Sequence, residues 1–160
     1  MAVSSTFAFT CDTRETLTAG VDGADNPVIY HNGFNVTGVI DSTTTPDAEG
    51  IVSKTLAMTA GAYTIDLSSM TGTNGAAVNM TGKAIRIFRI ENAGAAAMTI
   101  AKGASNGHTG LGATFQAAIP IGGAIQFYLK SGGVAVSGTD KTLDIAGTGT
   151  DSFNLTIVYG

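Results

Sequence analysis

This sequence has little cysteine, no tryptophan and few charged residues. Cys11 is its one cysteine, so no disulfide can form within the chain. Tryptophan is absent, and charged residues make up 12% of the chain, about half of the roughly 25% usual in soluble domains. A monomer that is free in solution usually carries more charge. Together with a mean hydropathy of +0.26, the low charge predicts that part of the surface meets another subunit.

Targeting and membrane signals are also missing. The first ten residues, MAVSSTFAFT, have neither the basic start nor the apolar run of a secretory signal. No apolar stretch approaches the roughly 20 residues that a membrane helix needs. Basic residues are too sparse for nucleic-acid binding. We therefore expect a protein that is made and folded in the cytoplasm, with neither a membrane nor a nucleic acid as its partner.

The charges that are present are unevenly placed. Residues 1–50 contain seven acidic residues and one basic residue, whereas residues 51–160 contain five acidic and seven basic residues. In one interpretation this difference is chance in a weakly charged chain. In the other, an acidic leading segment docks on a mildly basic body, either its own or that of a neighbour.

Periodicity predicts strands throughout the chain and almost no helix. Apolar residues nowhere recur at positions i, i+3, i+4 and i+7 over three turns. Short alternating runs separated by Gly-rich turns are typical of antiparallel sandwiches and barrels. We predict an all-β fold, an antiparallel β-sandwich of jelly-roll type with an N-terminal arm or extra strands. Residues 1–50 would form the acidic arm, packed on the core or on a neighbour, and residues 51–160 the sandwich.

The most strongly patterned stretch is Lys83–Ile100, KAIRIFRIENAGAAAMTI. Its period of two predicts a strand with one apolar and one charged face. The apolar face comprises Ile85, Ile87 and Ile90, and the charged face comprises Arg86, Arg89 and Glu91. Two apolar residues adjoin at Ile87–Phe88, which predicts a β-bulge there. Asn92–Gly94 then interrupts the run, so the stretch predicts a strand, a tight turn and a second strand.

Shorter runs predict the other strands. They are Thr6–Thr10, Val28–Tyr30, Val36–Ile40, Ile51–Met58, Ala62–Ser68, Ala76–Asn79, Ala113–Ile119, Ile125–Leu129, Val134–Val136, Leu143–Ile145 and Phe153–Tyr159. Asn32-Gly33 is a hairpin-turn dipeptide between two of these runs. Asp41–Gly50, DSTTTPDAEG, is the most hydrophilic stretch and predicts an exposed loop or an internal boundary.

One motif of catalytic type occurs, and its context argues against catalysis. Gly103–Gly107, GASNG, matches the G-x-S-x-G of hydrolase nucleophile elbows, and His108 follows it. Such an elbow needs a helix after its serine, and the residues HTGLGATFQ do not form one. A triad histidine would also lie opposite the serine rather than beside it in sequence. We predict a Gly-rich turn, no catalytic residues and no enzyme activity, with hydrolysis through Ser105 as the last-ranked alternative.

Metal and cofactor sites are not indicated either. His31 and His108 are the only histidines, and with Cys11 they do not form a zinc-binding spacing. Asp22–Asn26 offers oxygen ligands but lacks the acid spacing of an EF-hand, so a plain acidic turn is favoured over a weak calcium site. We predict no metal site and no cofactor.

Arg86 and Arg89 share the charged face of the central strand. The default expectation is a solvated face. In the alternatives, the arginines pair across strands with Asp66 or Asp144, or they bind an acidic neighbour such as another subunit's leading segment. An exposed ion pair contributes about 0–1 kcal/mol. A role in specificity is therefore favoured over a role in stability.

Four segments carry a resemblance to a known class of proteins. They are AGAYTIDLSSMTGTNGAAVNMTGKAIRIFRIEN, AMTIAKGASNG, the Gly turn before IQFYL, and the C-terminal KTLDIAGTGTDSFNLTIVYG. In pattern and texture these segments resemble small structural proteins of tailed bacteriophages. The resemblance implies a virion component of head-decoration or cement type with a β-sandwich core. The first sixty residues have no counterpart in it and are expected to form an arm that reaches a neighbour.

These expectations combine into one functional prediction. We expect a non-enzymatic capsid decoration or cement protein, assembled in the host cytoplasm, that forms a homo-oligomer and contacts the phage major capsid protein or another virion protein. The alternative is a carbohydrate- or host-surface-binding module of a tail or fibre, with Tyr30, Phe34 and Tyr128 as candidate exposed aromatics. The residues predicted to lie at an interface are Phe7, Phe9, Tyr30, Phe34, Arg86 and Arg89.

Overall fold

The computed structural model describes residues 3–11, 13–16, 28–31, 35–130 and 133–160, with the backbone alone for 13–16 and 28–31. These residues contain fourteen strands and no helix, as the alternating pattern predicts. Every pairing between named strands is antiparallel. The prediction of an all-β, antiparallel fold is therefore confirmed.

The first of two four-stranded sheets has the strand order β12-β9-β14-β5. Its strands are β5 (Gly50–Ala57), β9 (Ile85–Asn92), β12 (Ala124–Tyr128) and β14 (Ser152–Tyr159). Alternation in β14 shows why this segment forms a strand, because Phe153, Leu155 and Ile157 are buried and the residues between them are half-buried. β14 pairs with β5 on one side and β9 on the other, so it lies inside the sheet.

The second sheet has the strand order β11-β10-β13-β6. Its strands are β6 (Ala62–Asp66), β10 (Met98–Lys102), β11 (Gln116–Ile119) and β13 (Thr142–Ala146). Here too the inward face is apolar, with Ile65, Ile100 and Ile145 all buried. The opposite face carries polar residues such as Thr64 and Asp144, which pair across β6 and β13.

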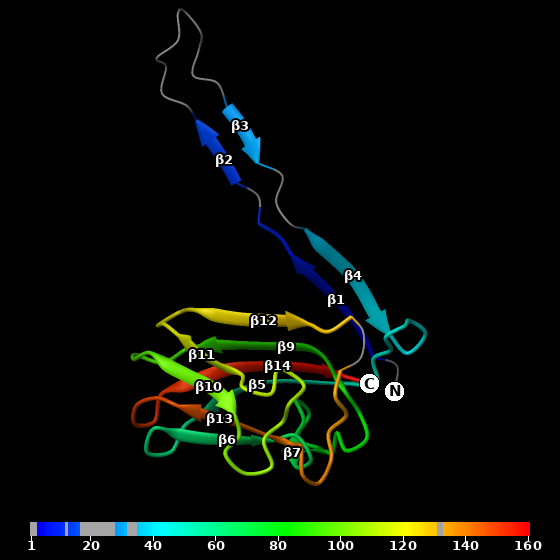
Figure 1. Ribbon diagram of the computed structural model, residues 1–160, viewed down its shortest axis with the longest axis vertical. Helices are drawn as coiled ribbons and strands as arrows, with labels where there is room; N and C mark the ends of the chain where they lie inside the picture. Colours follow the sequence, from blue (N-terminus) through cyan, green and yellow to red (C-terminus); the bar gives the residue numbers. More distant parts are fainter. Residues whose placement is uncertain (1–2, 12, 17–27, 32–34, 131–132) are drawn as a thin grey trace, which may run out of the picture.

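The two sheets face each other across a shared apolar core (Figure 1). Seventeen buried side chains form this core, and both sheets contribute, for example Phe88 and Leu155 from the first and Ile100 and Leu143 from the second. The arrangement is that of a β-sandwich. Fully burying one large apolar side chain contributes about 1.5–3 kcal/mol relative to leaving it exposed. The core is therefore the main source of the sandwich's stability.

The chain crosses repeatedly from one sheet to the other. Both strands predicted within Lys83–Ile100 are present, but β9 belongs to the first sheet and β10 to the second. Asn92 is buried at this crossing, and its side-chain amide donates to the carbonyls of Ala96 at 2.8 Å and Ile119 at 3.1 Å. Because these hydrogen bonds satisfy the amide, a polar residue is tolerated inside the fold.

The β-bulge in β9 lies slightly before the predicted position at Ile87–Phe88. The pairing with β14 shifts so that Arg86 is the extra residue. A bulge re-aims the side chains beside it. Ile85 and Ile90 consequently face the core between the sheets, whereas Ile87 joins a separate cluster on the outside of the first sheet. The prediction that these three isoleucines share one face is therefore wrong for Ile87.

The first four strands form two antiparallel pairs, one after the other, in a ribbon that is two strands wide and runs away from the sandwich (Figure 1). It is here called the N-terminal ribbon. The four strands are β1 (Ser4–Phe9), β2 (Thr13–Thr16), β3 (Val28–His31) and β4 (Val36–Asp41). β1 pairs with β4, and β2 pairs with β3. Since β3 and β4 do not pair with each other, the hairpin predicted at Asn32-Gly33, a dipeptide outside the described residues, is wrong.

The N-terminal ribbon packs on the sandwich at its base. A second apolar cluster, here called the base cluster, joins the two on the outer face of the first sheet. Its buried members are Phe7, Ile40, Ala48, Ile87 and Val158. Asp41–Gly50, predicted as an exposed loop, does loop between β4 and β5, but Ala48 within it is completely buried. The loop therefore contributes to the attachment of the ribbon.

Candidate functional site

The predicted interface residues divide between the N-terminal ribbon and the first sheet. The four with described side chains are Phe7 and Phe9 on β1, and Arg86 and Arg89 on β9. Tyr30 lies on β3, where side chains are not described, and Phe34 lies outside the described residues. The contacts of the first four show which of them another molecule can reach.

Phe7 is used within the molecule. Its ring centroid lies 4.3 Å from that of Tyr128, and its side chain is 7% exposed. On β4 it faces Gly38, where an added Cβ would come within 2.9 Å of the ring. Glycine therefore leaves the space that the phenyl ring fills. Phe9 is half-buried at the border of this cluster, with its ring 5.9 Å from that of Phe7.

Arg86 is also engaged within the chain. Its guanidinium donates to Asp47 Oδ1 at 3.2 Å, and its side chain is 16% exposed. Lys83 forms a neighbouring ion pair with Glu49. Both acids belong to the acidic leading segment and both bases to the rest of the chain. The leading segment therefore docks, at these two pairs, on the body of its own chain.

Arg89 is the most accessible of the four. It pairs with Glu91 on its own strand at 2.6 Å, and its side chain is 39% exposed. The acids predicted as partners are used elsewhere. Asp66 pairs with Lys141 at 3.0 Å, and Asp144 accepts a hydrogen bond from Thr64 at 2.8 Å. The predicted pairing of either arginine with Asp66 or Asp144 is therefore wrong.

The N-terminal ribbon exposes apolar side chains on both of its faces. Val36 and Val39 of β4 are 47% and 50% exposed. Because successive residues of a strand point to opposite faces, these two valines lie on different sides of the ribbon. Val36 stands opposite Phe9, and Val39 stands opposite Thr6. The ribbon thus offers apolar contacts in two directions.

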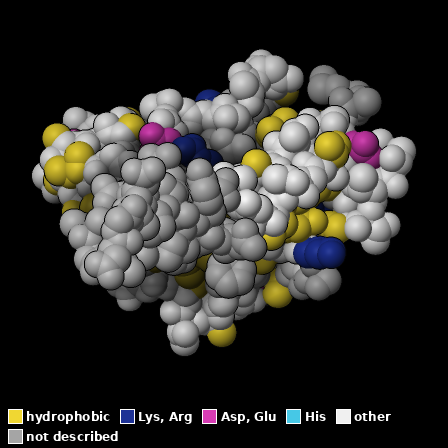
Figure 2. Space-filling view, turned by 90° about the horizontal axis from the view of Figure 1, so that it is seen from above, with side chains coloured by type: hydrophobic (Ala, Val, Ile, Leu, Met, Phe, Trp, Pro, Cys, Tyr) yellow, Lys and Arg dark blue, Asp and Glu magenta, His cyan; other side chains and the backbone are white. Residues whose placement is uncertain are grey.

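The outer face of the first sheet is polar but largely uncharged beyond the base cluster. Cross-strand hydrogen bonds join Ser53 to Thr156 at 3.0 Å and Thr55 to Asn154 at 2.7 Å. Figure 2 looks down on the ribbon end of the molecule, and the described charged side chains appear there as small separate groups in a mostly neutral surface. The described part of this face is weakly charged, in keeping with the composition of the chain.

His108 lies in the loop between β10 and β11, and its side chain is buried. Its Nδ1 lies 2.6 Å from Asp140 Oδ1, and Thr109 donates to the same carboxylate from both its amide and its hydroxyl. Burial raises the pKa of Asp140, but the hydrogen bonds from Thr109 and His108 lower it by more, so its pKa lies below the ordinary 3.8. The cluster fastens the loop that contains His108 to the residues that precede β13.

The GASNG loop has a structural role in these contacts. The Ser105 carbonyl accepts a hydrogen bond from the Thr142 hydroxyl. Gly103 lies against the same threonine, with no room for a Cβ, because an added Cβ would come within 2.1 Å of Thr142 Oγ1. Among the described residues, no hydrogen bond joins the Ser105 hydroxyl to His108. The geometry fits a tight loop packed on β13.

Other candidates from the sequence have little support. Cys11 is exposed, and its amide donates to Asn35 Oδ1 at 3.2 Å. Asp22–Asn26 lies outside the described residues. Within the part of the chain that the structure describes, no three His, Cys, Asp or Glu side chains are grouped to hold a metal. That same part has no helix suited to crossing a membrane.

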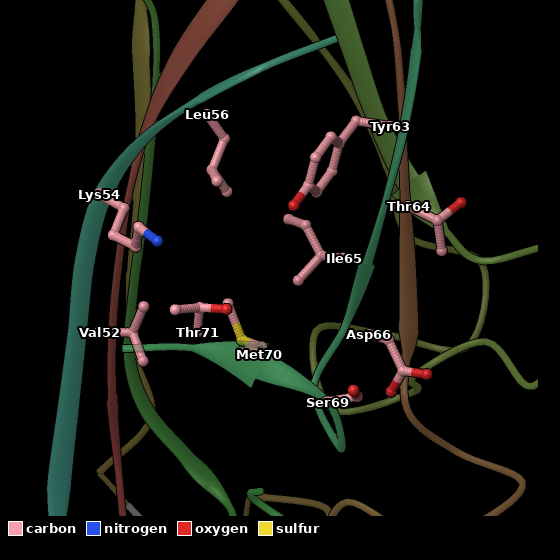
Figure 3. A pocket seen from close by; sticks show the side chains of 10 residues that line it. All are labelled: Val52, Lys54, Leu56, Tyr63, Thr64, Ile65, Asp66, Ser69, Met70 and Thr71. Carbon is pink, nitrogen blue, oxygen red and sulfur yellow. The ribbon is translucent and has the colours of Figure 1, made fainter. Parts of the chain in front are cut away.

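A pocket opens at one side of the sandwich, where the edge strands of the two sheets meet (Figure 3). β5 lines one wall and β6 the other, and the short strand β7 (Met70–Thr71), which pairs with β8 (Ala77–Val78), lies at its floor. Its volume is about 240 Å³. Lys54, Tyr63 and Thr71 are its central polar residues, and the sequence-based predictions did not include them. The sequence does contain a sign of this site, because Lys54 falls between Val52 and Leu56 on the same face of a predicted strand, and that face is otherwise apolar.

Comparisons of this chain with protein-family models, with curated proteins and with solved structures found no match.

Proposed function

We propose that this chain is a non-enzymatic structural subunit of a tailed-phage virion, of the capsid decoration or cement type. It would form a homo-oligomer and hold the major capsid protein or another virion protein through subunit contacts. The observation that carries the proposal is the N-terminal ribbon, which runs out from the sandwich and packs on it at the base. An isolated two-stranded ribbon is marginally stable in water. A neighbouring subunit that covers the ribbon would supply the missing stabilisation.

The architecture of the sandwich supports this role, and we assign it to the jelly-roll type as part of the proposal. Its strand pairs are nested in sequence: β5 with β14, β6 with β13, β9 with β12, and β10 with β11. Successive pairs fall alternately in the first and second sheets. Eight strands in two sheets with nested pairing are characteristic of jelly rolls, an architecture that viral capsid domains use.

The ribbon has the features of an element that grips a neighbour. Val36 and Val39 expose apolar surface on its two faces. The outer edges of a two-stranded ribbon present unpaired backbone groups, to which a strand from another chain can add. A specific protein interface buries about 1,200–2,000 Å² in total. The projecting ribbon and the neutral outer face of the first sheet together offer surface of this kind.

The alternative role, a carbohydrate- or host-surface-binding module, ranks second. Jelly rolls also occur as lectin domains. Of the aromatic residues that this role would use, Tyr128 is packed against Phe7 instead of standing free as a binding platform. A monomer that binds a glycan array and ignores capsids would favour this alternative over the structural role.

A shortened ribbon tests the proposal. Phe9 and Val36 are paired across β1 and β4, so replacing residues 10–35 by Asn-Gly closes the ribbon with a two-residue turn and keeps the base cluster. We expect the full chain to be oligomeric by native mass and to co-sediment with capsids of its phage. The shortened chain is expected to fold as a sandwich but to lose capsid binding.

The possible results separate the parts of the proposal. A full chain that stays monomeric at high concentration and binds no particle would overturn the structural role. Capsid binding that survives shortening would show that the sandwich, rather than the ribbon, makes the contact. Circular dichroism of both chains provides the folding control, because each should give a β-sheet spectrum.

A further inference from the structure

The pocket between β5 and β6 is lined by both polar and apolar side chains. Both strands are sheet edges, so the pocket lies at the open side of the sandwich. Val52 and Leu56 from β5, Ile65 from β6 and Met70 from β7 form apolar parts of the lining. At about 30 Å³ of liquid volume per water, the space of about 240 Å³ holds a ligand the size of a single sugar.

Lys54 is the unusual residue of this pocket. Its partner across the first sheet is Leu155, a core residue, so the lysine sits on the inward face of β5. Its ammonium points into the cavity (Figure 3), and among the described residues it has no ion pair or hydrogen bond. An inward-pointing charge on an edge strand can discourage edge-to-edge association. That role accounts for the charge but not for the polar groups opposite it.

Two hydroxyls face the same space. Tyr63 of β6 and Thr71 of β7 direct their oxygens toward the cavity (Figure 3), and no described residue hydrogen-bonds to either side chain. The Tyr63 ring packs edge-on against Phe153 with centroids 5.4 Å apart, which fixes the position of its hydroxyl. An ammonium and two hydroxyls that face one cavity, without hydrogen-bond partners among the described residues, offer donors to an anion.

The acid in the lining does not compete for the lysine. Asp66 points away from the cavity (Figure 3) and pairs with Lys141 at 3.0 Å. Its other oxygen accepts hydrogen bonds from the amide and the hydroxyl of Ser68, at 2.9 and 2.6 Å. The charge of Asp66 is therefore compensated outside the pocket, and Lys54 is left as the cation that faces the cavity.

We propose that this pocket binds a small ligand that carries an oxyanion, with the carboxylate of a sugar acid as the best fit. Lys54 pairs with the anionic group, and the hydroxyls of Tyr63 and Thr71 donate to its oxygens. Val52, Leu56 and Met70 contact the apolar face of the ring. Pockets that bind small molecules commonly combine an apolar lining with a few convergent polar groups. The inference is independent of the virion role, because it uses no residue of the N-terminal ribbon.

The test is a titration of the full chain, followed by backbone amide shifts, with glucuronate, glucose, acetate and inorganic phosphate. We expect glucuronate to give saturable shifts in β5, β6 and β7, and glucose, its uncharged counterpart, to give none. Comparable saturation by acetate or phosphate would support the oxyanion site and identify the simple anion as sufficient. The absence of saturation by all three anions up to tens of millimolar would overturn the proposal.

Variants locate the site. Removing a charge-assisted contact in Lys54→Met should weaken glucuronate binding about 10- to 100-fold. Tyr63→Phe keeps the ring and removes its hydroxyl, so a several-fold loss is expected even where Lys54→Met is poorly folded. Lys130→Met removes an exposed lysine elsewhere and should leave the affinity unchanged. Unchanged binding in both Lys54→Met and Tyr63→Phe would contradict the assignment.

Discussion

The sandwich and the N-terminal ribbon use the same alternating pattern under different conditions. In the sandwich, the apolar faces of two sheets close on each other and bury seventeen side chains. In the ribbon, two strands have no second layer beyond the base, where Phe7 and Ile40 reach the first sheet. Alternation therefore predicts a strand in both regions, but a strand is stable without a partner molecule only where a second sheet packs against it. We therefore expect the sandwich to be stable by itself, and the proposed subunit contact would give the ribbon the second layer that it lacks.

The comparison predicts that the largest losses of stability come from the sandwich core. Phe88 is completely buried between the sheets. Phe88→Ala should lower the free energy of unfolding by about 3–5 kcal/mol, because the lost contacts leave a cavity. Chemical denaturation measures this change. As the control, Ile121→Ala at a position 63% exposed should stay within about 0.5 kcal/mol of the parent chain.

The same chemical change in the ribbon should act locally. Phe7→Ala removes the main aromatic contact of the base cluster, and about 2–3 kcal/mol of local stability would be lost. Amide exchange in β1 and β4 should then accelerate about 30- to 150-fold, with a much smaller change in the unfolding of the sandwich. Gly38→Ala is a matched variant, because its Cβ would press on the Phe7 ring. Equal losses of global stability in Phe7→Ala and Phe88→Ala would show that ribbon and sandwich unfold as one unit.

Strands could be predicted from the sequence because alternation is local. The predicted strand Phe153–Tyr159 differs from β14 by one residue at its start. The predicted strand Ala62–Ser68 begins where β6 begins, but β6 ends two residues earlier, at Asp66. Strand partners could not be predicted, because they depend on distant residues. Thr55 and Asn154, for example, are 99 positions apart and hydrogen-bonded. A single extra residue at Arg86 was enough to turn Ile87 to the outside of the sheet.

The candidate sites show the same limit. Phe7 and Arg86 were predicted to lie at an interface, and in the structure they contact Tyr128 and Asp47 of their own chain, so an intermolecular role for them stays a prediction. Lys54 was visible in the sequence as a charge on an apolar face. Lys54 faces the same cavity as the hydroxyls of Tyr63 and Thr71 only because the edges of the two sheets meet. The local sequence pattern cannot predict that meeting.

Acid should affect the sandwich through Asp140, whose side-chain partners His108 and Thr109 lie in a loop of the sandwich. The pKa of Asp140 is lower in the folded chain than its ordinary 3.8. Its contribution to folding stability is therefore complete at pH values above 3.8. The contribution is lost as the pH falls through the folded-state pKa. Asp140→Asn should reduce stability at pH 7 by about 1–3 kcal/mol and flatten the stability profile below pH 4. Urea denaturation at several pH values measures both effects, and a profile as steep as that of the parent chain would place the acid sensitivity elsewhere.

The smallest expected effects come from the ion pairs beside the base of the ribbon. Glu49 and Lys83 are both more than a third exposed, so Glu49→Gln should change stability by about 0–0.5 kcal/mol. Arg86 is more buried, and its Nε has no hydrogen-bond partner among the described residues, so losing its pair leaves a charge less well compensated. Asp47→Asn should therefore have the larger effect, about 0.5–1 kcal/mol, after allowance for the exposure of Asp47. Denaturation at low salt and at about 1 M NaCl, where the Debye length is about 3 Å, should show the Glu49 effect vanish and part of the Asp47 effect persist. If both effects vanish together, the Arg86 pair is as solvated as the Lys83 pair, and neither ion pair contributes to holding the ribbon at its base.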